Sequence, residues 1–494
     1  MAPRIPAVSV RLARTLTLGL FAFWSALASA DPWLAPGDEG LRSDIERLAD
    51  AGILHGPVTT WPLSWPDVAR DVLAAEEAGL DDATLGALVR VRRLARDSSS
   101  SGFSGVGIRV SGAYEPTTLR QFADTPREEG ELGMRASWLT DHFAVNLQGS
   151  YVASPDDGKD WRADGSYVGV NFGNFMLSAG LMERWWGPGW DGSLILSTNA
   201  RPIPSVTLER NYTDPFKSRW LSWIGPWRAS IAMGRMESHD VPVPDVRFFA
   251  ARINFKPRPW LEFGLTRTAQ WCGGDRPCDW NTFVDMVLGN DNQIDENGGD
   301  EQQPGNQMAG YDMRLRSPWR KLPLTFYTQL IGEDEAGYMP AKFIGQFGLE
   351  TWGSSGFGGW RVRAEYADTA CNYSRHPPLY GCAYRNSIYP QGYAYRGRII
   401  GHSMDNDSRM YTLAGLLTRE NGDLLGVTLR RVEFNRDGGD HAISEVPLNL
   451  DNVELRYSRG LWAGKVTVGI GYDDPAISAD ASRVHGFATW QQGF

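Results

Sequence analysis

The sequence predicts a mainly β fold: an antiparallel outer-membrane β-barrel of about 18 strands with a small N-terminal helical bundle on its periplasmic side. From about Phe103 onward, apolar and polar residues alternate along many short segments. Short and long connections also alternate, which is typical of barrels with tight periplasmic turns and extended outer loops. Residues after position 30 contain no apolar run long enough for a membrane-spanning helix, so a closed sheet is the remaining way across a bilayer.

Residues 1–30 are predicted to be a secretory signal peptide. Arg4, Arg11 and Arg14 precede an uncharged stretch, Thr15–Ala30, whose last three residues fit an A-x-A cleavage site. The stretch is shorter than the ~20 apolar residues that a membrane helix needs. Cleavage would remove three of the 49 basic residues and none of the 59 acidic ones, so the formal net charge would move from -10 to -13.

The composition excludes some partners and favours a β protein. An acidic chain without clustered Lys and Arg lacks the basic surface that nucleic acid requires, so no nucleic-acid partner is expected. Glycine accounts for 55 of the 494 residues, above the ~7% average, and the chain has 20 Trp, 17 Tyr and 20 Phe. These numbers favour a β protein whose aromatic belts contact outer-membrane lipid over an α/β enzyme.

Residues 31–102 are predicted to form the periplasmic helical domain. Apolar residues recur there at helical intervals, and Ser64 and Pro66 are start signals for the second of three short helices. A bundle of this size is expected to lean on the neighbouring structure. The apolar positions are Leu41, Ile45, Leu48 and Ala49 in the first helix and Leu85, Leu88, Val89 and Leu94 in the third.

Residues 103–494 are predicted to form the transmembrane barrel with long extracellular loops. In "HFAVNLQGSYV", Phe143, Leu147 and Tyr151 alternate with polar or small residues. A soluble sandwich would give the same alternation, so the connection lengths decide for the barrel. The last segment carries Trp490 in phase and ends on Phe494, like the terminal strand of bacterial outer-membrane proteins. The predicted long connections lie near 115–130, 153–164, 184–216, 237–244, 272–308, 369–407, 435–446 and 474–482.

The four cysteines are predicted to form two local disulfides in the loops. Cys272 lies close to Cys278, and Cys371 lies close to Cys382. In an exported protein such pairs favour disulfides, and among three possible connectivities the short loops favour these two. Their spacing and the single nearby imidazole, that of His376, argue against zinc.

One run, "MERWWGPGWDGSLILSTNARP" from 182 to 202, has an unusual composition. Strand counting makes it the third outer loop, and Gly187, Pro188 and Gly189 break the preceding strand. Its apolar portion, "SLILSTNA", cannot remain in water, so we expect the loop to pack inward as a plug or constriction. Trp185 and Trp186 could instead belong to the aromatic girdle at the lipid headgroups.

A second interpretation makes the same run a sugar site. Aromatic faces pack on the apolar side of a pyranose while nearby polar groups bind its hydroxyls. Trp190, Asp191, Asn199 and Arg201 fit this interpretation best, because they lie furthest from the strand.

The run resembles the hallmark segment of the Wzi capsule-assembly family, and "LRSDIERLADAGILHGPVTTWPLSWPDV" resembles the start of its helical domain. The resemblance implies a lectin-like protein, not an enzyme, that attaches capsular or extracellular polysaccharide to the cell surface. The export machinery is a candidate partner, and a monomer is expected. The implied polysaccharide-binding residues are Trp185, Trp186, Trp190, Asp191, Asn199 and Arg201; the implied structural residues are Gly187, Pro188, Gly189, Ser193, Ala200 and Pro202.

Two other functions stay open at this stage, a general diffusion porin and a glycan hydrolase. Glu183 and Asp191 could form the carboxylate pair of a hydrolase, although a sequence does not set their separation. The segment "GHSMD" at 401–405 fails as a nucleophile elbow because Asp405 replaces the final glycine. No cofactor is expected, but the oxygen-rich stretch 291–303 is a candidate Ca2+ site.

Overall fold

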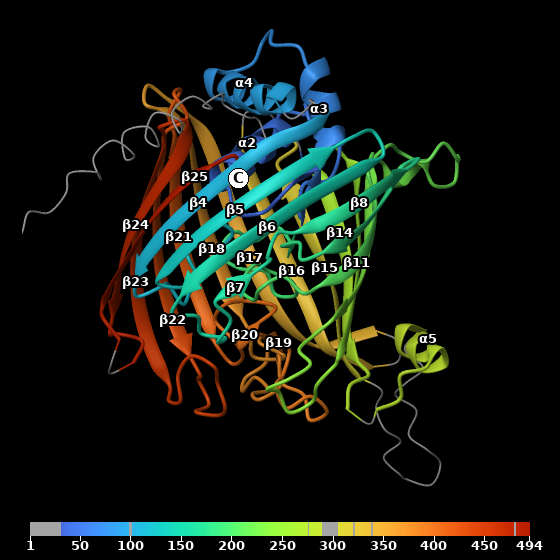
Figure 1. Ribbon diagram of the computed structural model, residues 1–494, viewed down its shortest axis with the longest axis vertical. Coiled ribbons are helices and arrows are strands. Elements are labelled where there is room, and N and C mark those ends of the chain that lie inside the picture. The colour runs from blue at the N-terminus through green and yellow to red at the C-terminus, as the bar shows by residue number, and fades with distance from the viewer. Residues whose placement is uncertain are drawn as a thin grey trace, which may run out of the picture.

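The computed structural model describes residues 31–494 except 98–100, 275, 289–304, 320–321, 337–338 and 479–480. The predicted signal peptide and the candidate Ca2+ stretch 291–303 therefore lie outside the described residues. The described chain forms a closed antiparallel barrel with three helices at one end (Figure 1). In that part of the chain, none of the helices has the length and apolar character needed to cross a membrane.

The barrel wall has eighteen strand positions, as predicted. Nineteen described strand segments take part, and β7 and β8 share one position beside β6. β25 pairs with β4, from Gly486 opposite Tyr114 to Gln492 opposite Ile108, and this pairing closes the sheet. The segments are β4 (Gly102–Tyr114), β5 (Gly130–Leu139), β6 (Phe143–Ala153), β7 (Trp161–Arg162), β8 (Tyr167–Phe172), β9 (Phe175–Gly180), β11 (Ser205–Arg210), β12 (Trp227–Arg235), β13 (Arg247–Arg258), β14 (Leu261–Trp271), β15 (Gly305–Arg316), β16 (Leu324–Ala336), β17 (Met339–Ser355), β18 (Gly358–Asp368), β21 (Arg409–Thr418), β22 (Leu424–Phe434), β23 (Leu448–Leu461), β24 (Gly464–Asp474) and β25 (Val484–Gln492).

The alternation of apolar and polar residues along the strands places apolar side chains outside and polar ones inside the barrel, as predicted. On β6, Phe143 and Leu147 are exposed on the outer surface, whereas Ala144 and Asn146 are buried in the interior. Successive side chains of a strand point to opposite faces, so an apolar outside and a polar inside follow directly from the sequence. The same pattern holds on β18, where Val362 is exposed while the charged residues on either side of it are buried.

Exposed aromatic side chains gather at both ends of the wall, as the belts of outer-membrane barrels do. At the end that carries the helices, they lie in or beside the connections between strands. At the opposite end they lie near the long loops. The first group includes Trp220, Trp223, Trp319, Phe357 and Trp462, and the second includes Tyr114, Tyr151, Trp161 and Trp280.

The connection between β9 and β12 corrects one predicted boundary. The stretch 184–216 was expected to be a single long loop, but it contains β11 (Ser205–Arg210). The strand expected to follow is instead a connection, 211–226, with the 3-10 turn η1 (Ser222–Ile224). Trp220 and Trp223 of this connection are exposed, and the stretch lacks the strict alternation that a wall strand needs.

The helical bundle consists of α2 (Glu39–Asp50), α3 (Trp65–Ala74) and α4 (Asp82–Asp97). Ile45 and Leu48 are buried in its core, as predicted. The prediction for α4 was wrong in part, since Val89 and Leu94 are 43% exposed. α4 packs through a narrower stripe made of Ala87, Leu88, Val91 and Ala95, because small residues let it approach the other helices closely. Three two-residue strands, β1 (Trp33–Leu34), β2 (Thr60–Trp61) and β3 (Leu63–Ser64), lie beside the helices.

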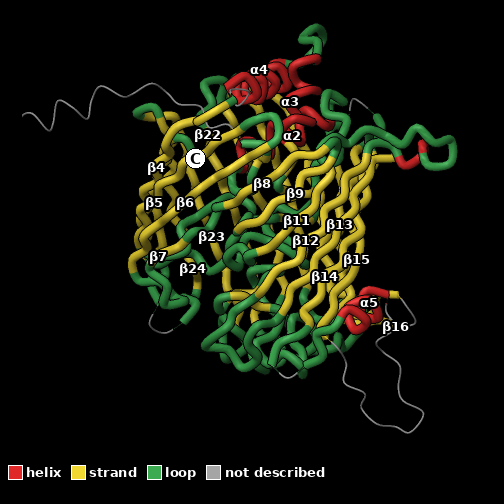
Figure 2. Tube along the Cα trace, turned by 45° about the vertical axis from the view of Figure 1, so that its right-hand side comes forward, coloured by secondary structure: helices red, strands yellow, loops and turns green. Residues whose placement is uncertain are grey.

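Helix α2 lies at the mouth of the barrel, beneath α3 and α4 (Figure 2), and two of its acidic residues pair with arginines of the wall. Glu46 pairs with Arg361 at 3.3 Å, and Asp50 pairs with Arg314 at 2.8 Å. Both arginines also pair with Glu350 on the wall. These buried charges are mutually satisfied, and they attach the bundle to the polar interior that the strands create.

Both predicted disulfides are present, Cys272 with Cys278 and Cys371 with Cys382. The helix α5 (Trp280–Leu288) follows the first disulfide and packs against the outside of the wall, where Phe283 lies 5.1 Å from Trp271 between ring centroids. This contact explains why Trp271 is buried although its position on β14 points outward. The short segments β19 (Ala394–Tyr395) and β20 (Arg398–Ile399) pair within the loop that carries the second disulfide.

Candidate functional site

The loop between β9 and β11, residues 181–204, fills the barrel interior instead of extending from it. Its tryptophans Trp185, Trp186 and Trp190 are at most 1% exposed. Leu194 and Ile195 are fully buried and belong to the largest apolar cluster inside the barrel. The prediction that the loop packs inward is confirmed, because its apolar stretch leaves water only by entering the lumen.

Trp185 and Trp186 are not part of an aromatic girdle, so that interpretation was wrong. They form β10 (Trp185–Trp186), which pairs with β2 of the helical domain. The Trp185 indole donates to the carbonyl of Gly189 at 2.9 Å, and Trp186 packs in the interior cluster. A girdle residue faces lipid from the outer surface of a strand, whereas these two lie on a loop that has turned inside.

Trp190 is surrounded by cations. The guanidinium of Arg42 lies 4.2 Å from the ring centroid, that of Arg363 at 4.8 Å and that of Arg361 at 5.6 Å. Such contacts use the negative face of the indole. Arg42 also donates to the carbonyls of Pro188 and Gly189 at 2.6 and 2.9 Å, so helix α2 holds this turn directly.

Asp191 is held by the opposite wall. Arg430 of β22 donates to both of its carboxylate oxygens at 2.6 to 3.0 Å, and the Thr412 hydroxyl donates at 2.6 Å. Burial alone would raise the pKa of Asp191, but the Arg430 guanidinium and these hydrogen bonds bring it down to about 2. The carboxylate is therefore charged and fully engaged, which argues against a role as a hydrolytic acid.

The rest of the predicted site residues also contact protein. Asn199 donates to the carbonyl of Ile399 at 2.9 Å, and the Ser193 hydroxyl donates to the carbonyl of Trp186 at 2.6 Å. Arg201 pairs with Asp164 at 2.8 Å and also with Asp157. Of the six predicted polysaccharide-binding residues, Arg201 is the one with partial exposure. Among the predicted structural residues, Gly187, Pro188, Gly189, Ser193 and Ala200 are buried together with Pro202.

Glycines permit the tight packing of this loop. A Cβ added to Gly192 would lie 2.0 Å from Nε2 of His402. Gly187 has a φ of +146°, and a Cβ added to it would lie 2.7 Å from the amide nitrogen of Gln329 on β16. Only glycine fits these two positions without a shift of the wall or of the neighbouring loop.

Among the cavities lined by described residues, two adjoin the filled interior. One, of about 570 Å³, lies in the lumen beside β4, β5 and β6 and is lined by mixed charges. The other, of about 340 Å³, opens at the loop end between the connections 369–408 and 435–447. Sequence reasoning missed the second cavity, because its residues come from two loops joined only in space. The segment "GHSMD", rejected as a nucleophile elbow, begins the stretch that forms its floor.

Comparison with known proteins agrees with this architecture. The family described as "Capsule assembly protein Wzi" matches residues 104–481. A Klebsiella pneumoniae protein, described as an uncharacterized 55.8 kDa protein in the cps region, is 32% identical over 376 residues, which cover 74% of this chain and 71% of the relative. The solved structure of Wzi from Escherichia coli is described as an outer membrane protein involved in group 1 capsule assembly and as a carbohydrate-binding β-barrel. It matches at 26% identity with a TM-score of 0.81, over 93% of this chain and 99% of that chain. The chain therefore belongs to the capsule assembly protein Wzi family and is an outer-membrane β-barrel.

Proposed function

We propose that this protein binds capsular polysaccharide and holds it at the outer surface of the outer membrane without changing it chemically. The observation that carries the proposal is the filled lumen of a member of this family: loop 181–204 occupies the space through which a porin would conduct. Because the lumen is filled, the part of the barrel that a polysaccharide can contact is the outer surface formed by the long loops. Such a surface suits binding better than transport. The carbohydrate-binding relative from Escherichia coli supports the same role.

The proposal includes an orientation. The end with the helices and most of the short connections faces the periplasm, and the end with the long loops faces outward. The helices lie at the end where β4 begins, since Asp97 ends α4 a few residues before β4 starts at Gly102. If the helices face the periplasm, the export machinery would contact the protein at the helical end of the barrel.

The six predicted polysaccharide-binding residues have an indirect role in this proposal. The contacts of Trp190 with Arg42, Asp191 with Arg430, Asn199 with Ile399 and Arg201 with Asp164 keep the loop inside the barrel. A fixed loop in turn supports the outer loops that pack on it. Loss of these contacts is therefore expected to weaken polysaccharide attachment by altering the shape of the outer surface.

A deletion strain tests the proposal most directly. Polysaccharide is measured in the cell-bound and medium fractions of the deletion strain and of the same strain carrying the wild-type gene. The expected result is a shift of polysaccharide from cells to medium with an unchanged total. An unchanged cell-bound fraction would refute attachment, and a fall in the total would point to export instead.

Two experiments on purified protein distinguish polysaccharide binding from diffusion through a porin and from glycan hydrolysis. Wild-type barrel in a planar bilayer is expected to conduct far less than an open porin, because the lumen is filled. Incubation with purified capsular polysaccharide is expected to leave the chain length of the polysaccharide unchanged. Large steady conductance would favour the porin, and shortened polysaccharide would favour the hydrolase.

A further inference from the structure

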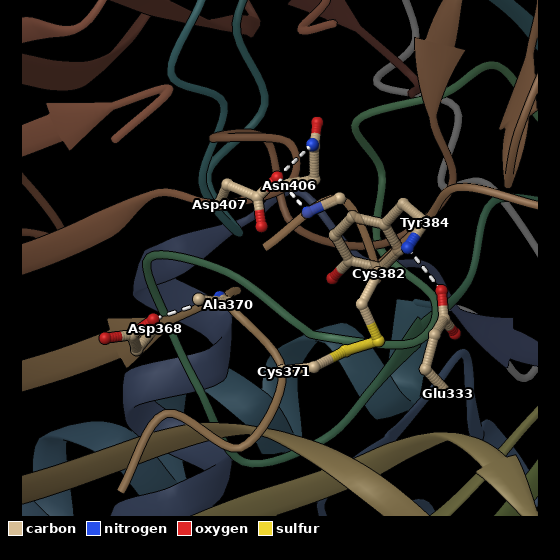
Figure 3. Close-up of a disulfide and its surroundings, with 9 residues drawn as sticks. Glu333, Asp368, Ala370, Cys371, Cys382, Tyr384, Asn406 and Asp407 are labelled. Carbon is tan, nitrogen blue, oxygen red and sulfur yellow. Dashed lines mark hydrogen bonds between the residues drawn. A yellow bond between two sulfur atoms is a disulfide. The ribbon is translucent and has the colours of Figure 1, made fainter. Parts of the chain in front are cut away.

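The cavity of about 340 Å³ at the loop end has a buried floor and an exposed rim. Asn406 and Asp407 form the floor and are at most 1% exposed. Asp437 and Asp440, from the other loop, are exposed at the rim, and Arg385 lies between floor and rim. The floor lies close to the disulfide between Cys371 and Cys382 (Figure 3).

The Asp407 carboxylate is only half satisfied by the protein. Its Oδ2 accepts hydrogen bonds from the Gly381 backbone amide at 2.9 Å and from the Asn406 side chain at 2.6 Å. Its Oδ1 is buried, and no described residue donates to it. Burial and the charge of Asp437 raise the pKa of Asp407 to about 6. A buried acceptor without a donor is costly, and a ligand hydroxyl would supply the missing hydrogen bond.

The surroundings of Asp407 are held in place before any ligand arrives. Thr369 Oγ1 donates to the carbonyl of Asp405 at 2.6 Å, and the amide of Ser408 donates back to Thr369 Oγ1 at 3.1 Å. The disulfide closes the loop that supplies Gly381. A site fixed in this manner loses little conformational freedom on binding.

Arg385 is positioned as a donor beside the floor. It contacts the Asp440 carboxylate at 3.1 Å and the Asn406 side-chain oxygen at 3.3 Å. A guanidinium carries five N–H donors in a fixed plane, so it can donate to a ligand oxygen while keeping such contacts. An acceptor on Asp407 and a donor on Arg385 together match neighbouring hydroxyl oxygens of a sugar ring.

The net negative charge of the cavity lining favours uncharged sugars over acidic ones. Three lining carboxylates, those of Asp407, Asp437 and Asp440, face one guanidinium, that of Arg385. An acidic sugar would meet repulsion there. The described residues contain no group of three or more His, Cys, Asp or Glu side chains placed to hold a metal ion that could bridge such a sugar. The volume is in the range of small-molecule sites, about 300–1,000 Å³.

We propose that this cavity binds an uncharged sugar residue of the polysaccharide, with Asp407 Oδ1 accepting a hydrogen bond from a ring hydroxyl and Arg385 donating to a neighbouring oxygen. The inference rests on the proposed attachment function and assigns its contact site. It places recognition on the two outer loops and not on the tryptophan-rich loop inside the barrel.

The test uses full-length protein purified in detergent and capsular polysaccharide purified from the source strain. Asp407→Asn keeps the side-chain shape, and Arg385→Gln removes the donor. Each is expected to weaken binding about tenfold or more, the size associated with a hydrogen bond to a charged group. Asp141→Asn, in an exposed turn at the opposite end, is the charge-matched control and is expected to bind like wild type. Heat-dependent gel migration confirms that every variant is a folded barrel.

The outcomes separate the site from the function. If both cavity variants bind polysaccharide as tightly as the wild type, the cavity is not the binding site, but the proposed attachment function is not contradicted. Absence of wild-type binding would overturn attachment itself. For the wild type, methyl hexosides are expected to compete better than methyl hexuronosides. Equal competition would overturn the selection for uncharged sugar, and loss of binding in EDTA would replace direct recognition with a cation bridge.

Discussion

Asp191, in the loop that fills the barrel, forms a buried two-oxygen pair with Arg430 of the barrel wall, and the Arg430 Nη2 to Asp191 Oδ1 distance is 2.6 Å. Both side chains are 1% exposed. From the other side, Arg42 of α2 donates to the carbonyls of Pro188 and Gly189 in the same loop. The loop is therefore held between the wall and the helical bundle, and its position depends on both.

Arg430→Ala is expected to destabilise the barrel by about 3–5 kcal/mol, because it leaves the buried carboxylate of Asp191 without its paired arginine and leaves Glu454 with Arg456 alone. The heat-dependent gel shift of purified protein measures the change. Arg459→Ala is the control: its pair with Asp423 is 3.8 Å long and its side chain is 59% exposed, so a change below about 1 kcal/mol is expected. Equal effects of the two variants would contradict this account.

Trp190→Ala combined with Arg201→Ala is expected to release polysaccharide from cells without stopping its export. The double change removes the centre of the cation cluster and the contact with Asp164, so the loop loses support at both places. Cell-bound and medium polysaccharide are compared with those of a strain carrying Trp220→Ala and Arg219→Ala, which alter exposed residues of the β11–β12 connection. Normal retention in the first strain would show that the loop does not support attachment.

Gly192→Ala is expected to lower stability by about 1–3 kcal/mol, the usual cost of overpacking a filled interior. The added methyl group would lie 2.0 Å from His402 Nε2. Gly149→Ala on β6, with nothing within 4 Å of its added Cβ, serves as the matched control. His402→Ala in the Gly192→Ala background should recover part of the loss, and a double variant no better than the single one would argue against this contact.

Stability is expected to fall between pH 6.5 and pH 4 through His402. Burial lowers the pKa of this histidine to about 4, and the charges of Asp191 and Arg430 act on it in opposite directions. The unfolded chain binds the proton more readily in this window, so the neutral folded form is favoured above pH 6.5 and loses its advantage as the pH falls. The shift corresponds to about 3 kcal/mol.

The measurement compares the denaturation temperatures of wild type and His402→Gln at pH 7.5 and pH 4.5. The wild type should lose more stability than the variant on acidification, since glutamine does not titrate. Parallel losses would assign the acid sensitivity to other groups.

The sequence alone was sufficient to predict the barrel, its strand number and its helical end. Alternation with a period of two is a local property, and Phe143 and Leu147 display it whatever the rest of the chain does. The cysteine pairing was also predictable, because Cys371 and Cys382 are close along the chain. The inward course of the tryptophan-rich loop followed from its apolar composition. The boundary at 211–226 did not, because an interfacial turn and a strand contain similar aromatic residues.

Only the tertiary structure decided what the side chains of that loop contact and where an outer cavity lies. Arg42 and Gly189 are 147 residues apart, and Arg430 is 239 residues from Asp191. The cavity joins Asp407 to Asp437 and Asp440 across two different loops. Such pairs arise because closing the barrel brings distant strands and loops around one interior, whereas periodicity and motif spacing describe only residues that are neighbours along the chain.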